Sequence, residues 1–134
     1  GARLVLGGKP IDRPGFFYEP TIVAGVEPGM PMFDQEVFGP AAAVAIADDE
    51  DDAIRLANAS TFGLGASLWT RDVARAQRLA ARVQAGSVFI NGIVASDPRL
   101  PFGGIKKSGH GRELSAFGIA EFTNIQTIWI GPAK

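Results

Sequence analysis

The alternation of strand and helix signals in the middle of this 134-residue chain constrains its fold more than any other feature. Residues 41–47 are a continuous apolar run of strand length, as expected for a strand that is buried on both faces. The acidic run 48–52 follows, and we expect Asp48 to cap a helix there. Two further strands, 65–70 and 87–90, are separated by an amphipathic helix. This βαβαβ order predicts an α/β fold with a mostly parallel sheet, flanking helices and right-handed crossovers.

The outer parts of the chain add strands and loops to this core. Strands are expected at 3–6 and 21–26, and residues 31–39 fit neither helical nor strand periodicity and are expected to form a loop. The long Gly- and Pro-rich stretch 91–111 is typical of a functional loop. Residues 122–130 alternate like a terminal strand. An unpaired edge strand invites association, so we expect this one to pair, for example with another subunit.

The composition excludes several classes of function. A hydrophobic share of 46% and a net charge of −1 indicate a globular chain without the basic surface of a nucleic-acid-binding protein. No apolar run is long enough to span a membrane. Without cysteine, and with His110 as its single histidine, the chain offers no thiol nucleophile and no expected metal site. The start at Gly1, without Met or signal peptide, predicts a cytoplasmic chain and a fragment.

Two segments have residues suited to ligand binding. Glu36 and Phe38 lie two apart in a loop that leads into a strand, where a carboxylate can accept sugar hydroxyls and a ring can pack on a flat heterocycle. Composition alone favours a simpler interpretation, a strand-entry turn whose Phe belongs to the core. Phe102 precedes Gly103 and Gly104, which could present its ring to a cleft or belong to a surface loop with a packed Phe.

Four stretches resemble motifs of the NAD(P)-dependent aldehyde dehydrogenase superfamily, in family order and spacing. EVFGP at 36–40 resembles the E-x-F-G-P segment, and PFGGIKKSG at 101–109 resembles P-F-G-G-x-K-x-S-G. FGLGASLWT at 62–70 and GSVFIN at 86–91 are similar to two further family stretches, so that the resemblance covers nearly the whole chain. Within the superfamily, SDPRLPFGG at 96–104 is most similar to bacterial succinate-semialdehyde dehydrogenases.

The resemblance implies roles for four residues. Glu36 matches the acid that holds the nicotinamide ribose hydroxyls, and Phe38 matches the aromatic residue beside the nicotinamide of NAD or NADP. Phe102 matches a ring that lines the tunnel for the small aldehyde substrate. Ser96 lies in the loop at the tunnel mouth, where a serine can contact the distal carboxylate of a semialdehyde. An Arg partner is also expected for that carboxylate.

The absence of cysteine limits what this chain can do alone. The family reaction needs a Cys thiolate that forms a thiohemiacetal, hydride transfer to NAD(P)⁺, and a Glu-activated water that releases the acid. In the family both residues lie upstream, in the missing N-terminal part of the same enzyme. We therefore interpret residues 1–120 as the C-terminal part of the catalytic domain and 121–134 as a strand for homo-oligomerisation. The chain alone, with no catalytic residue of its own, is expected to be inactive.

Other interpretations stay open. The parent enzyme could act on glutarate semialdehyde, lactaldehyde or betaine aldehyde instead of succinate semialdehyde. The chain could also be a non-catalytic interaction module that keeps the fold. The absence of cysteine favours such a module, whereas Glu36 and Phe38 argue against it, because a pure scaffold needs neither.

Overall fold

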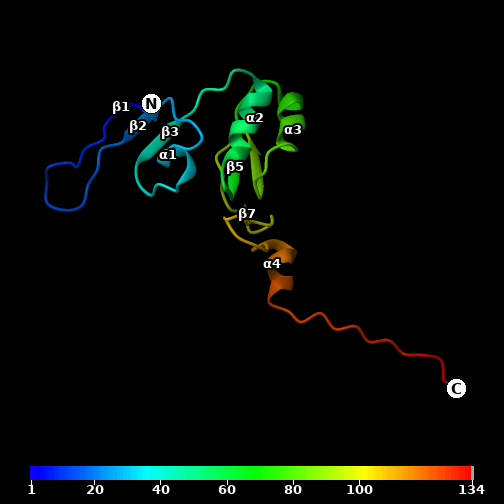
Figure 1. The fold of residues 1–134 in the computed structure, drawn as a ribbon. Helices are drawn as coiled ribbons and strands as arrows, with labels where there is room; N and C mark the ends of the chain where they lie inside the picture. Colours follow the sequence, from blue (N-terminus) through cyan, green and yellow to red (C-terminus); the bar gives the residue numbers. More distant parts are fainter. Residues whose placement is uncertain (134) are drawn as a thin grey trace. The chain divides into compact units, whose positions relative to one another are not determined.

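The computed structural model describes residues 1–133, which divide into two compact units. The first unit comprises residues 1–61 and 81–84, and the second comprises 62–80 and the residues from 85 onward. Short strands and helices occur in both units (Figure 1), which confirms the mixed α/β class. The helices are α1 (Pro31–Asp34), α2 (Glu50–Ala59), α3 (Val73–Ala80) and α4 (Ser115–Glu121).

The first unit is built on a three-stranded sheet in the order β1 (Arg3–Leu6), β2 (Thr21–Ala24) and β3 (Ala41–Val44). β1 runs antiparallel to β2, and β3 runs parallel to it. The segment between β2 and β3 contains α1, a single helical turn where we expected only a loop. Pro31 begins this turn, because the fixed φ of proline suits the first helical position and its missing N–H costs nothing there.

The second unit has two small sheets. β5 (Gly65–Leu68) runs parallel to β6 (Ser87–Ile90), with α3 as the crossover between them. β4 (Phe62–Gly63) pairs antiparallel with β7 (Ile105–Lys106), which lies inside the long loop predicted from the sequence.

The predicted βαβαβ sheet is therefore only half present. The β5–α3–β6 unit is confirmed, but β3 pairs with β2 and not with a strand that follows it. Over residues 1–133 two strand pairings are parallel and two antiparallel, so the prediction of a mostly parallel sheet is wrong for this chain. Sequence periodicity identified β3 as a strand but carried no information about which strand it pairs with.

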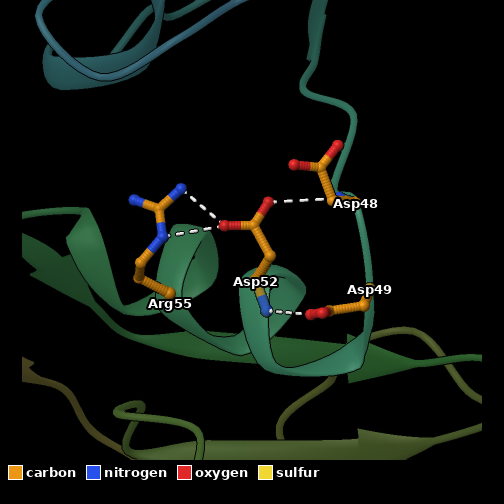
Figure 2. A network of polar contacts seen from close by, with 4 residues as sticks. All are labelled: Asp48, Asp49, Asp52 and Arg55. Atoms are coloured by element: carbon orange, nitrogen blue, oxygen red, sulfur yellow. Dashed lines mark hydrogen bonds and ion pairs between the residues drawn. The ribbon is translucent and has the colours of Figure 1, made fainter.

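The start of α2 explains the acidic run after β3 (Figure 2). Asp49, and not Asp48 as predicted, is the N-cap, since its carboxylate accepts a hydrogen bond from the amide of Asp52 at 2.8 Å. The carboxylate of Asp52 accepts the amide of Asp48 at 3.2 Å and Nε of Arg55 at 2.8 Å. These acids thus satisfy the amides that open the helix, and they lie where the helix dipole favours negative charge.

Few side chains form a core. Among residues 1–133 the buried apolar side chains are those of Val26, Ile54 and Ala76. β3, which we predicted to be buried on both faces, is largely exposed, because β2 pairs along one edge of it and no helix of the described residues packs closely on its faces. None of the helices described in this range is long and apolar enough to cross a bilayer.

The expected terminal strand is not formed in the single chain. Residues 124–133 have no helix or strand assignment and continue from α4 as an extended segment (Figure 1). An extended segment becomes a strand only when its backbone groups find a partner. The apolar side chains of this segment are exposed, and Trp129 is 81% exposed.

We predict that the isolated chain self-associates. Large side chains such as Trp69, Phe117 and Trp129 remain in contact with water, and exposed apolar surface of this kind drives association. Light scattering at rising concentration should show a growing mean mass, and replacing Ile128 and Ile130 with Lys should reduce that growth. A single monomeric species at every concentration would contradict this expectation.

We also predict that Arg55 sets the pKa of Asp52. The hydrogen bond from the Arg55 side chain, followed by that from the Asp48 amide, holds the pKa of the Asp52 carboxyl below its usual 3.8. Because the pKa is lower in the folded state than in the unfolded state, the ionised carboxyl stabilises the fold at pH values above 3.8. This contribution is lost as the pH falls through the lowered pKa. An NMR titration should show the Asp52 pKa rising in the Arg55→Gln variant and unchanged in Arg78→Gln. An identical Asp52 pKa in Arg55→Gln and Arg78→Gln would refute the interaction between Arg55 and Asp52.

Candidate functional site

The segment that leads from α1 to β3 holds the first pair of predicted site residues. α1 ends where Gln35 donates its amide to the carbonyl of Pro31, and the chain then runs extended. The end of this segment at Pro40 is fixed beside β2, because the amide of Thr21 donates a hydrogen bond to the carbonyl of Pro40 at 2.8 Å. Between these two anchors lie Glu36 and Phe38, both exposed to solvent.

Phe38 lies at the surface of the described residues. Its ring is 88% exposed, so it packs against no core formed by residues 1–133. The carboxylate of Glu36, two residues earlier, is also at the surface. An accessible carboxylate and an accessible ring on one short loop fit the chemistry of a nucleotide ligand, since the acid can accept ribose hydroxyls and the ring can cover a flat heterocycle.

The second predicted segment is a closed loop in the second unit. Phe102 and Glu113 exchange both backbone hydrogen bonds, at 2.9 and 2.8 Å, and so close residues 102–113 into a loop. The ring of Phe102 is half-buried and lines a hollow of about 410 Å³. Leu64 and Phe122 contribute apolar surface to this hollow, and Arg112 contributes a charge.

The two glycines after Phe102 allow a close approach of backbone. A Cβ on Gly103 would lie 2.7 Å from the carbonyl oxygen of Gly111, and a Cβ on Gly104 would lie 2.5 Å from Cβ of Ser108. No side chain fits in either place. Packing therefore requires glycine at both positions.

Ser96 and Arg99 lie in the same loop region with different surroundings. Ser96 is exposed. Arg99 is engaged with Asp97, to which it donates from Nε at 2.9 Å and from Nη2 at 2.6 Å. These hydrogen bonds hold the pKa of Asp97 below its usual range and raise that of Arg99. Arg99 is thus already paired with a carboxylate of its own loop.

The structure places the predicted residues in two pairs. Glu36 and Phe38 lie in the first unit, and Ser96 and Phe102 lie in the second. Ser96 is not among the residues that line the hollow beside Phe102.

Sequence reasoning missed the residues that fix these loops. Asn91 forms two hydrogen bonds with the backbone of Thr70, accepting from its amide at 2.9 Å and donating to its carbonyl at 2.8 Å. It thereby extends the β5–β6 pairing by one residue, with φ at 54°, a value that Asn tolerates better than most residues. The available signals were its position, directly after a strand and at the start of a long loop, and its place at the end of the GSVFIN stretch at 86–91.

The chain belongs to the aldehyde dehydrogenase family, which matches residues 1–128. Two succinate-semialdehyde dehydrogenases [NADP(+)] are similar to it. That of Mycobacterium avium is 52% identical over 134 residues, covering 100% of this chain and 28% of the relative. Enzyme 1 of Mycobacterium tuberculosis strain H37Rv is 53% identical over 130 residues, covering 97% and 28%. The chain thus spans less than a third of the length of these relatives.

Solved structures agree with this assignment. The succinic semialdehyde dehydrogenase of Streptococcus pyogenes, in complex with NADP⁺, matches at 45% identity with a TM-score of 0.94, over 98% of this chain and 29% of that one. The betaine aldehyde dehydrogenase of Staphylococcus aureus, in complex with NAD⁺, matches at 39% with a TM-score of 0.87, over 91% and 25%. The resemblance to this family that the sequence motifs indicated is therefore confirmed.

The Asn91 contact can be tested in a hybrid enzyme, in which this chain replaces the matching segment of the Mycobacterium avium relative. Asn91→Ala removes two hydrogen bonds and leaves a left-handed φ, so the free energy of unfolding should fall by about 2–4 kcal/mol. Asn91→Asp keeps the oxygen that accepts the hydrogen bond from the Thr70 amide, so its free energy of unfolding should fall less. Denaturant unfolding measures both variants, and equal stability of Asn91→Ala and the parent hybrid would contradict the assigned role.

Proposed function

We propose that this chain is the C-terminal part of an enzyme that oxidises an aldehyde, succinate semialdehyde in the first place, to the carboxylic acid with NADP⁺ or NAD⁺. The observation that supports this most is the exposed pair Glu36 and Phe38 on an anchored loop, in a chain similar to NADP-dependent semialdehyde dehydrogenases. Residues 1–120 would then belong to the catalytic domain. An interaction module remains a weaker candidate, since it gives these two exposed residues no task.

The residues of this chain would bind and orient. When bound, the nicotinamide cofactor supplies the acceptor for the hydride that leaves the substrate. Glu36 would hold the ribose hydroxyls through its carboxylate, and Phe38 would lie against the nicotinamide ring and exclude water from one side. Phe102 would line the path of the aldehyde, and Ser96 would meet the distal carboxylate at its mouth. Because Asp97 already engages Arg99, the cationic partner of that carboxylate would come from the upstream part.

The proposal also states how this chain packs against the rest of the enzyme and against a second copy. We infer that the missing N-terminal part covers the exposed β3 and the half-buried β5 and β6 and extends these small sheets, so that more of their strands run parallel. Residues 121–134 would pair with a second copy of the enzyme and form a homo-oligomer, because their exposed apolar side chains need a partner. The cytoplasmic location expected from the sequence stays a prediction.

The proposal predicts activity only in the presence of the upstream part. The isolated chain contains no cysteine and should give no NADPH from succinate semialdehyde and NADP⁺. The hybrid enzyme should form NADPH, and faster with succinate semialdehyde than with betaine aldehyde. Absorbance at the NADPH band measures both. Turnover by the isolated chain, or a folded hybrid without turnover, would refute the proposal.

Glu36 should affect the binding of the cofactor and not the binding of the aldehyde. Glu36→Gln keeps the shape of the side chain but removes its charge, and hydrogen bonds to a charged group contribute about 1.5–3 kcal/mol. In the hybrid enzyme the KM for NADP⁺ should therefore rise roughly tenfold or more, with the KM for the aldehyde unchanged. Glu27→Gln, another exposed glutamate of the first unit, serves as the control. An unchanged KM for NADP⁺ in Glu36→Gln would remove Glu36 from the site.

A further inference from the structure

The loop of residues 102–113 is held to β4 by the β4–β7 pairing and by a serine side chain. Oγ of Ser108 accepts the amide of Gly63 at 3.0 Å, across 45 positions of sequence. Gly63 is buried, so water has little access to its amide when this acceptor is removed. The carbonyl of Gly63 in turn accepts the amide of Gly86 at 2.9 Å. A single residue of β4 is therefore bonded on one side to the loop and on the other to the start of β6.

The same serine lies directly behind the glycines that follow Phe102. Cβ of Ser108 occupies the space next to Gly104, while the carbonyl of Gly103 lies against Gly86. Nη1 of Arg112 donates to the carbonyl of Gly104 at 2.9 Å and closes the loop from its other end. Phe102 thus begins a stretch of backbone that has little room to shift as long as Ser108 stays in place.

We propose that Ser108 is a positioning residue for the ring of Phe102, acting through its hydrogen bond to Gly63. This inference rests on the proposed function, in which Phe102 lines the path of the aldehyde. Without the hydroxyl, the buried amide of Gly63 lacks an acceptor, the contact between β4 and the loop loosens, and the backbone before Gly103 can shift. The ring then no longer presents one fixed wall to the substrate.

The test uses the hybrid enzyme with five variants. Ser108→Ala should raise the KM for succinate semialdehyde about fivefold, the factor that corresponds to about 1 kcal/mol, the net contribution of one hydrogen bond. The kcat and the KM for NADP⁺ should change less than about twofold, because Ser108 acts on the aldehyde side alone. Ser108→Thr keeps the hydroxyl and should restore the KM of the parent hybrid.

The remaining variants separate positioning from general stability. In a Phe102→Ala background, Ser108→Ala should leave the aldehyde KM nearly unchanged, because the ring that it positions is gone. If Ser108→Ala does not fold, Ser108→Cys keeps the side-chain volume with a weaker acceptor and should give an intermediate KM. A parent-like KM in that variant would then overturn the proposal.

The outcomes distinguish this inference from the proposed function. No aldehyde turnover by the unsubstituted hybrid would refute the proposed function and, with it, the role of Ser108. Turnover with an unchanged aldehyde KM in Ser108→Ala would refute the role of Ser108 alone. Equal rises in the KM for aldehyde and cofactor, or the same rise with and without the Phe102 ring, would show a merely structural role and would also overturn it.

Discussion

The shortage of buried apolar surface is the constraint on which the rest of this structure depends. Hydrophobic burial is the main driving force of folding, yet Val26, Ile54 and Ala76 are the buried apolar side chains of residues 1–133. The strands are short, and a two-stranded sheet such as β5–β6 is marginal by itself in water. We therefore expect such a chain to be stable only as part of a larger structure, and it spans less than a third of the length of its relatives.

Polar contacts fix the ends of helices and strands, because the small core is not large enough to do so. Asp49 caps α2, Asn91 continues the hydrogen bonding of β5 and β6, and Ser108 binds the amide of Gly63. Each contact satisfies a backbone group at the end of an element, where the regular pattern of hydrogen bonds stops. The loop with Glu36 and Phe38 is anchored by backbone hydrogen bonds instead, from Gln35 to Pro31 and from Thr21 to Pro40.

The sequence predicted local elements well and long-range contacts poorly. The strands at 3–6 and 87–90 were recognisable because each is a short apolar run next to glycine. The partner of β3 was not recognisable, because pairing depends on segments that no local pattern connects. The contact of Ser108 spans 45 residues and that of Asn91 spans 21, so neither could be read from spacing. The roles of Glu36 and Phe38 came from resemblance, and the structure adds that both are exposed.

Hydrogen–deuterium exchange tests most directly whether polypeptide outside this chain completes its fold. We predict fast deuterium uptake at the amides of residues 41–44 and 65–68 in the isolated chain, because these strands have uncovered edges and faces. In the hybrid enzyme the same amides should exchange orders of magnitude more slowly, on the scale of global unfolding. Equally slow exchange in both proteins would mean that the chain forms its own complete core and would contradict our central claim.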